Sequence, residues 1–75
     1  MKIKKLSLKD TFSKNVRKYR LELKLSQEEF AEIAGVHRTY IGSVERGERN
    51  ITINVMEKIC KALNRPITDF FYNKD

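Results

Sequence analysis

Residues that form covalent or metal cross-links are nearly absent from this sequence. Its 75 residues include one cysteine, Cys60, and one histidine, His37, so an internal disulfide is excluded and a cysteine-based zinc site cannot be assembled. No apolar run approaches the roughly 18 residues that span a bilayer. The basic start MKIKKLSLK is not followed by an apolar segment, so it is not a signal peptide, and we expect a cytoplasmic protein.

The sequence also lacks the arrangements that catalysis requires. It contains no phosphate-binding loop, no metal-ligand cluster and no acid paired with a base or nucleophile. His37 has no partner for metal binding or catalysis, and we assign it to a helix start or a phosphate contact. Cys60 lies in the apolar segment 55–63, which is typical of a small core residue. We therefore expect a protein that is not an enzyme and that binds no metal or cofactor.

Positive charge is what the chain has in excess. It carries 16 Lys and Arg residues against 10 Asp and Glu residues, for a net charge of +6, and such a domain is attracted to phosphate backbones or anionic lipid. The length predicts one domain, residues 8–75, behind a basic N-terminal arm, residues 1–7, that is either frayed or a phosphate contact. A domain of this size buries only roughly 60% of its unfolded surface, so a partner subunit would stabilise it.

Periodicity and capping residues predict five helices with short connections. The first helix starts near Leu8. A capping box formed by Ser26 and Glu29 starts the second helix. Gly35 ends it in the left-handed conformation that glycine adopts at the least cost. The inward residues are Phe12, Val16, Tyr19, Arg20 and Leu23 in the first helix, and Phe30, Ile33 and Ala34 in the second.

The remaining three helices follow from the same signals. The third spans residues 37–47 and ends at a glycine. Thr52 caps the fourth, and Asn64, two residues before a proline, stops it. Thr68 is expected to cap a last short helix, residues 69–72. The inward residues are Ile41 and Val44 in the third helix, and Ile53, Met56, Ile59, Cys60 and Leu63 in the fourth.

Residues 26–47 form the most specific pattern in the chain, two short helices around a tight turn. Ala31 lets the two helices approach closely, and Gly35 fixes the turn between them. The pattern predicts a helix-turn-helix, whose first helix lies across the DNA backbone and whose second helix enters the major groove. An ordinary helical hairpin is the alternative, but such hairpins rarely combine a small residue, a glycine turn and a basic polar face.

The second helix of this motif carries most of the side chains expected to contact DNA. Arg38, Thr39 and Ser43 are predicted to project toward base edges, where Arg pairs with guanine O6 and N7 and Thr offers its methyl or hydroxyl. Tyr40 is predicted to pack on sugar or to sense groove deformation, and Gln27 to contact a phosphate. The full set of candidate DNA contacts is Gln27, His37, Arg38, Thr39, Tyr40, Ser43, Arg46, Arg49 and Asn50.

Two charged residues fall on inward faces. Arg20 lies on the inward side of the first helix, and Glu45 lies at the inward end of the third. Because each alone would be costly to bury, we predict that they form an ion pair that orients the recognition helix. The alternative is two exposed charges.

Over residues 16–71 the sequence resembles the Cro/C1-type, or XRE-like, helix-turn-helix regulators. The resemblance implies an all-α fold, a compact five-helix lambda-repressor-like DNA-binding domain with the helix-turn-helix in helices 2 and 3. It also implies a buried ion pair between Arg20 and Glu45. The signature residues of the family are Ser26, Gln27, Ala31, Gly35 and Val36, followed by Glu45, Arg46 and Gly47. The operator contacts that it implies are Gln27, Arg38, Thr39 and Ser43.

A narrower resemblance is carried by the segment HRTYIGSVERGERNITI. It is similar to the R-T-Y-I-x-x-x-E-R-x-x-R-N-x-T segment of restriction–modification controller proteins. That resemblance implies a small dimeric regulator that activates, then represses, its own operon and the endonuclease gene. It also implies that Arg38, Thr39 and Tyr40 recognise or sense the operator sequence. The alternatives are a phage-type repressor, or an antitoxin or adaptor whose main partner is another protein.

The expected partners are a second copy of the chain and a pseudo-palindromic double-stranded DNA operator with half-sites roughly 34 Å apart. A short terminal helix does not bury two adjacent phenylalanines by itself, so we place the dimer interface there; the alternative is that both complete the monomer core. RNA polymerase is a further candidate partner for the acidic side of the second helix, unless those charges only favour the helix dipole. The interface candidates are Leu63, Ile67, Phe70, Phe71 and Tyr72, and the acidic residues are Glu28, Glu29 and Glu32.

Overall fold

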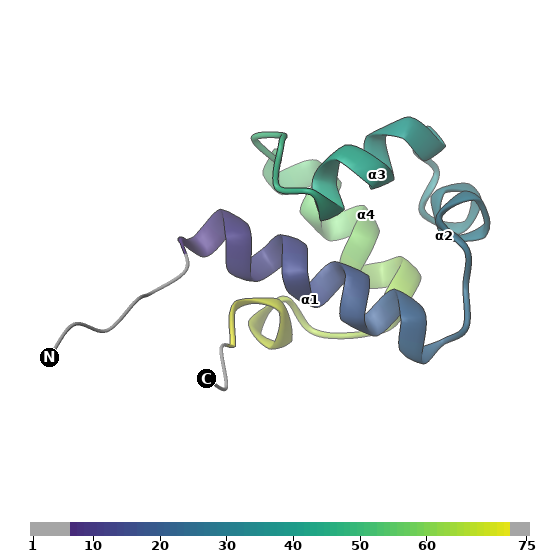
Figure 1. Ribbon diagram of the computed structural model, residues 1–75. Helices are drawn as coiled ribbons and strands as arrows, with labels where there is room; N and C mark the ends of the chain where they lie inside the picture. The colour runs from purple at the N-terminus through teal and green to yellow at the C-terminus, as the bar shows by residue number, and fades with distance from the viewer. Residues whose placement is uncertain (1–6, 73–75) are drawn as a thin grey trace, which may run out of the picture.

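The computed structural model describes residues 7–72, which form four α-helices and a C-terminal 3-10 helix (Figure 1). The predicted all-α fold is confirmed, but the count of five α-helices is not, because the last element is a 3-10 helix. The predicted arm, apart from Ser7, lies outside the described residues. The helices are α1 Leu8–Glu22, α2 Gln27–Ala34, α3 Arg38–Glu45 and α4 Ile53–Leu63, and the 3-10 helix is η1 Ile67–Phe71.

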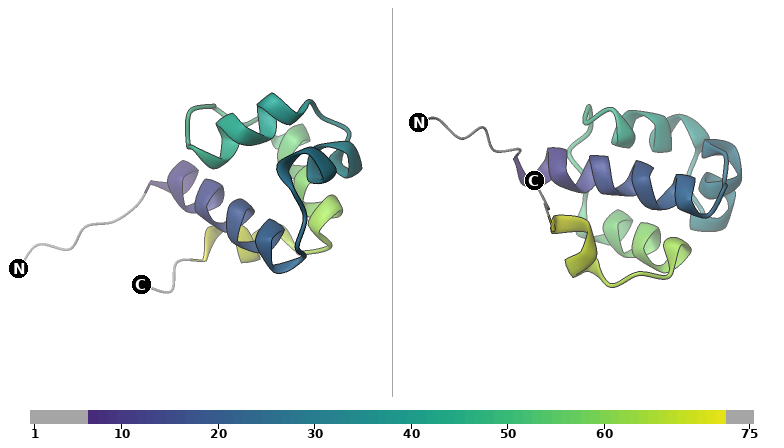
Figure 2. Two further views of the ribbon diagram at one scale, coloured as in Figure 1. Left: turned by 45° about the vertical axis from the view of Figure 1, so that its right-hand side comes forward. Right: turned by 60° about the horizontal axis from the view of Figure 1, so that its bottom comes forward.

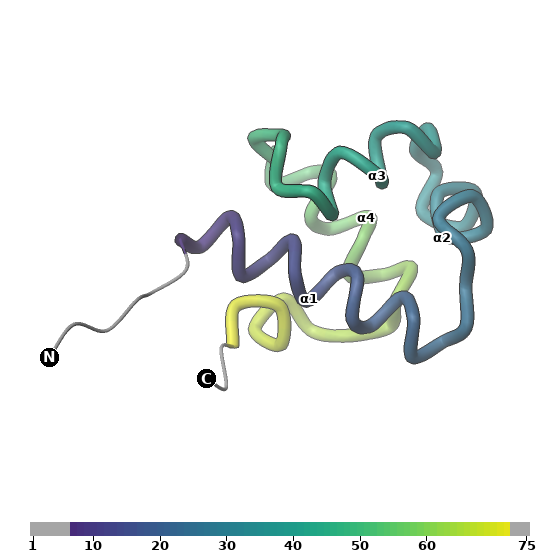
Figure 3. Tube along the Cα trace, viewed as in Figure 1, coloured from purple at the N-terminus to yellow at the C-terminus, as the bar shows by residue number. Residues whose placement is uncertain are grey.

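Helix α1 lies at the centre of the arrangement. It packs against α3 on one side and against η1 on the other, and both views in Figure 2 keep α3 and η1 on opposite sides of it. Helix α4 packs against α1, α2 and η1. The trace in Figure 3 shows that α2 and α3 are joined by a tight turn at one end of the molecule. This arrangement leaves one face of α3 turned away from the other helices.

The helix boundaries are set by local hydrogen bonds, as the sequence predicts. Ser26 Oγ accepts from the Glu29 backbone N–H at 3.0 Å, and the Glu29 carboxylate accepts from the Ser26 N–H at 2.8 Å, which completes the capping box. Gly35 ends α2 with φ of 75°, and Asn64 ends α4 with φ of 55°. Thr52 caps α4 through its side chain.

The core forms where the four α-helices and η1 meet. Three expected inward residues, Leu23, Ile33 and Ile53, are instead exposed. Leu23 and Ile53 lie at helix ends, where the chain has already reached the surface. Ile33 is about 100° around α2 from the centre of its buried face, because each residue turns the helix by roughly 100°. The fully buried side chains are Phe12, Val16, Phe30, Ile41, Val44, Ile59 and Phe70.

The 3-10 helix η1 is held by side chains of α1. Asn15 Nδ2 donates to the backbone carbonyls of Phe70 at 2.7 Å and Tyr72 at 3.0 Å, and Tyr19 Oη donates to the Asp69 carbonyl at 3.0 Å. The expected cap from Thr68 is wrong, because η1 starts after Pro66 without a side-chain cap. These carbonyls lie at the C-terminal end of η1, where a helix leaves its last C=O groups without internal partners, and side chains of α1 satisfy them.

Cys60 is a core residue, as predicted. It is 8% exposed, and burial raises the pKa of its thiol, so the thiol stays protonated at neutral pH. Within residues 7–72, no helix combines the length and apolar character needed to cross a membrane. The same part of the chain contains no group of three or more His, Cys, Asp or Glu residues placed to hold a metal ion.

Ser13→Ala is expected to stabilise the protein by roughly 0.5–1.5 kcal/mol. Ser13 is 3% exposed, and its Oγ is a buried side-chain polar atom without a hydrogen-bond partner among the described residues. Removing the hydroxyl ends its desolvation cost and improves helix propensity. Urea denaturation would measure the change, with Ser26→Ala as the control that loses a cap and about 1 kcal/mol. Destabilisation of both variants alike would contradict the prediction.

Candidate DNA-binding surface

The first turn of α3 is ordered by the residue that precedes it. His37 Nδ1 accepts from the Thr39 backbone N–H at 3.1 Å, so this nitrogen is unprotonated and His37 caps the helix. The Thr39 hydroxyl lies 2.7 Å from the same nitrogen and therefore donates to it. Both side chains are exposed. The cap orients the exposed Thr39 hydroxyl, whose oxygen keeps lone pairs that can accept a hydrogen bond.

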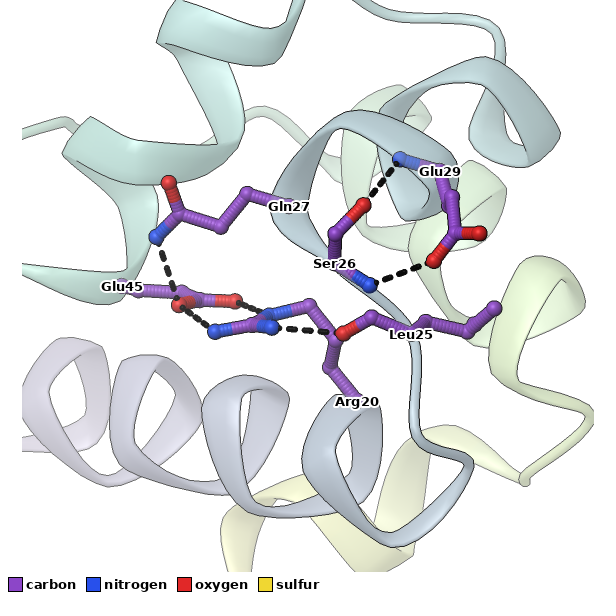
Figure 4. A network of polar contacts seen from close by, with 6 residues as sticks. All are labelled: Arg20, Leu25, Ser26, Gln27, Glu29 and Glu45. Carbon is purple, nitrogen blue, oxygen red and sulfur yellow. Dashed lines mark hydrogen bonds and ion pairs between the residues drawn. The ribbon is translucent and has the colours of Figure 1, made fainter.

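A buried ion pair fixes α3 to the rest of the domain, as the sequence predicts (Figure 4). Arg20 Nε and Nη2 donate to the two carboxylate oxygens of Glu45 at 2.7 and 3.0 Å, and the side chains are 8% and 3% exposed. Arg20 Nη1 donates to the Leu25 carbonyl at 2.7 Å. The bidentate geometry sets the orientation of α3 relative to α1 and to the loop before α2.

Gln27 also belongs to this network. Its Nε2 donates to Glu45 at 3.0 Å and so links α2 to the end of α3, while the predicted phosphate contact of Gln27 stays a prediction. Figure 4 shows Gln27 reaching from the start of α2 toward the ion pair. A Cβ at Gly42 would come within 3.4 Å of Gln27 Oε1 and 3.1 Å of Arg46 Nη1. Both atoms are the ends of flexible side chains, so an added Cβ would displace Gln27 or Arg46 without by itself separating α2 from α3.

An open cleft separates the start of α2 from the outer face of α3. Within it, Arg38 Nη1 donates to Glu28 Oε2 at 2.6 Å, although both side chains are largely exposed. This contact links two residues that lie ten positions apart in the chain. The cleft is lined by Gln27, Glu28, Arg38, Thr39, Gly42 and Arg46.

The cations beyond the middle of α3 have their own partners. Arg46 Nε donates to Glu48 at 2.9 Å, and this hydrogen bond lowers the pKa of the Glu48 carboxyl and raises that of Arg46. The Arg49 guanidinium lies 4.7 Å from the centroid of the Tyr40 ring, and its Nε donates to Ser43 Oγ at 2.8 Å. Arg49 is therefore held on the surface of α3 by uncharged groups.

The prediction that Ser43 projects outward is wrong. Ser43 is 7% exposed. Its hydroxyl donates to the Tyr40 carbonyl at 2.9 Å and accepts from Arg49 Nε. The loop that follows α3 folds back and covers it. Tyr40 is half-buried and packs against the core, whereas Arg38, Thr39, Arg46, Arg49 and Asn50 are exposed.

The residues predicted to form the dimer interface differ in burial. Phe70 is fully buried and Leu63 is 3% exposed, so both belong to the monomer core and not to a free surface. Phe71 is half-buried, with its ring centroid 5.4 Å from that of Phe12. Ile67 and Tyr72 are exposed and remain candidates.

Three features of this surface were not anticipated from the sequence. The role of Gly42 could have been suspected from the sequence. A glycine inside a helix costs roughly 1 kcal/mol relative to alanine, so its presence there suggests a packing reason. No sequence signal predicts the contact between Glu28 and Arg38, because their spacing across a turn matches no helical or strand period. Arg49 was predicted at the surface, but its placement over Tyr40 depends on the path of the loop.

Comparisons with known proteins agree with this geometry. The helix-turn-helix family matches residues 16–70. The control protein C.SmaI of Serratia marcescens is 52% identical over 62 residues, which cover 83% of this chain and 74% of that protein. The crystal structure of the restriction–modification controller protein C.AhdI from Aeromonas hydrophila has a TM-score of 0.79 at 35% identity, covering 83% of this chain and 94% of that one.

The hypothetical transcription factor NHTF from Neisseria has a TM-score of 0.86 at 32% identity, over 91% of this chain and 78% of that one. These relatives are regulators rather than enzymes, in agreement with the prediction that this chain is not an enzyme. The family match spans α2, α3 and the ion pair of Figure 4. The chain therefore belongs to the helix-turn-helix family, in the Cro/C1-type (XRE-like) branch that its sequence predicts.

Proposed function

We propose that the protein is a restriction–modification controller, a sequence-specific DNA-binding regulator that activates and represses its own operon. The observation that carries the proposal is the division of α3 into two faces. Its inner face is fixed by the Arg20–Glu45 ion pair, and its outer face presents Arg38 and Thr39 to solvent. The second helix of a helix-turn-helix enters the major groove of DNA. The controller proteins among the relatives support the choice of subfamily.

The proposed contacts fall into two groups. Arg38 and Thr39, at the start of α3, contact base edges, because the N-terminal residues of a recognition helix lie deepest in the groove. Arg46, Arg49 and Asn50 lie at the end of α3 and in the loop after it, where they contact phosphates.

The proposed assembly is a homodimer on a pseudo-palindromic operator. Ile67 and Tyr72 are 42% and 64% exposed, and with half-buried Phe71 they lie in or next to η1, which is on the side of α1 opposite α3. A symmetric contact there would leave both recognition helices on the outside. Such a regulator acts on DNA in the cytoplasm. Contact between the acidic side of α2 and RNA polymerase stays a prediction.

The test is binding to DNA from upstream of the protein's own gene, measured against scrambled DNA at about 150 mM salt. Tight, cooperative and selective binding is expected, and footprinting would then locate the operator. Equal weak binding to both duplexes would contradict the proposal. In that case the operator would lie elsewhere, or the main partner would be another protein, as for an antitoxin or adaptor.

Arg38→Ala is expected to reduce operator affinity by about 1–3 kcal/mol and to relax the preference at one base pair. Arg49→Ala is expected to weaken operator and scrambled DNA to similar extents and to flatten the salt dependence, because it removes a phosphate contact. Anisotropy titrations of both variants with a set of single-base operator substitutions would measure these effects. If Arg38→Ala weakens all sequences equally, its assignment to a base edge is wrong.

A further inference from the structure

The contact between Glu28 and Arg38 occupies only one nitrogen of the arginine. Arg38 Nη1 donates to Glu28, and among residues 7–72 the structure shows no protein acceptor for its Nε or Nη2. An arginine pairs with guanine through two N–H groups and presents five in a planar fork. The carboxylate therefore holds the side chain while leaving donors for a base edge.

The position of Glu28 gives it a second effect. It lies in the first turn of α2, across the cleft from α3, where the helix dipole favours its negative charge. A carboxylate at this place repels any phosphate that approaches Arg38. A guanine edge presents neutral acceptors and is not repelled in the same way. Arg49, in contrast, makes its hydrogen bond and ring contact with the uncharged Ser43 and Tyr40, and the Glu48 carboxylate near it is hydrogen-bonded to Arg46 instead.

We propose that Glu28 is a positioning residue that determines specificity: it orients Arg38 for a base edge and disfavours the phosphate contacts of non-specific binding. The inference rests on the proposed function, because it assigns a role within the same DNA-binding surface. Ordering a long side chain before binding lowers the entropy that recognition must otherwise remove. The contact is solvent-exposed, so its loss has little effect on folding.

The test compares Glu28→Gln with Glu32→Gln in an assay that contains DNA but no RNA polymerase. Glu32 is exposed on the same helix, so its variant removes the same charge without a contact to Arg38. Each protein is titrated against the wild-type operator and a scrambled duplex, and thermal melts check folding. Glu28→Gln is expected to lower the ratio of operator to scrambled affinity by about five- to tenfold, mainly by tightening scrambled binding. Glu32→Gln is expected to change that ratio by less than about twofold.

A double mutant separates positioning from a general charge effect. In an Arg38→Ala background, Glu28→Gln should change the affinity ratio no more than Glu32→Gln does, because the side chain that it positions is gone. Equal effects of the two single variants, or an effect of Glu28→Gln that persists without Arg38, would overturn the inference. Failure of the proposed function is visible separately, because the wild-type protein itself would then not distinguish the two duplexes.

Discussion

Glu45→Ala is expected to destabilise the folded protein by about 3–5 kcal/mol. The substitution leaves the Arg20 guanidinium nearly buried, with the Leu25 carbonyl as its remaining hydrogen-bond acceptor in the described structure. It also removes the acceptor of the Gln27 amide. Small domains are stable by only roughly 5–15 kcal/mol, so this loss is a large fraction of the total stability. Urea denaturation of the purified variant, monitored by circular dichroism, measures the loss.

The matched control replaces both charges. Arg20→Met combined with Glu45→Leu removes the pair without leaving an unpaired ion, so most of the lost stability should return. Its operator affinity should stay below that of the wild type, because the bidentate contact that orients α3 is missing. A loss below about 1 kcal/mol for Glu45→Ala would mean that water reaches the pair as it does in a surface salt bridge.

Phe70→Ala is expected to cost about 3–5 kcal/mol of folding stability, the usual range for a buried phenylalanine. Phe70 is fully buried, with its ring centroid 5.3 Å from that of Phe12 and 5.2 Å from that of Tyr19. Its truncation leaves a cavity between α1 and η1. Thermal and urea denaturation would measure the loss.

Tyr72→Ala is the control that separates the core from the proposed dimer surface. Tyr72 is 64% exposed, and its contact with Asn15 uses the backbone carbonyl, which the substitution keeps. Monomer stability should therefore change by less than about 0.5 kcal/mol, while sedimentation velocity should show a weaker dimer. If Phe70→Ala instead melted like the wild type and sedimented as a monomer, Phe70 would belong to the interface after all.

The ends of the helices were predictable because the interactions that set them are local. The capping box of Ser26 and Glu29, and the left-handed stops at Gly35 and Asn64, each involve residues within a few positions of one another. The last element was not predictable in the same way. Residues 67–71 form a 3-10 helix whose last carbonyls are bound by Asn15 and Tyr19, which are about 50 positions away in the chain, so local signals do not contain these contacts.

The same distinction applies to the candidate site. The pairing of Arg20 with Glu45 was predictable, because burying either charge alone is costly. The helical phase of Ser43 also predicts outward projection, about 200° around α3 from buried Ile41. The side chain is nevertheless covered, because Arg49 returns over it from the loop. A helical wheel describes one helix and contains no information about what a later loop covers.

The two faces of α3 have different evolutionary freedom. Arg38 and Thr39, the proposed base contacts, are exposed and contribute little to the core, so under the proposed function a gene copy can acquire a new operator preference in single steps without loss of folding. Changes at Arg20 and Glu45 are coupled, because each single substitution passes through an unstable intermediate. Diverging lineages of this protein can therefore exchange their DNA targets while inheriting the same scaffold.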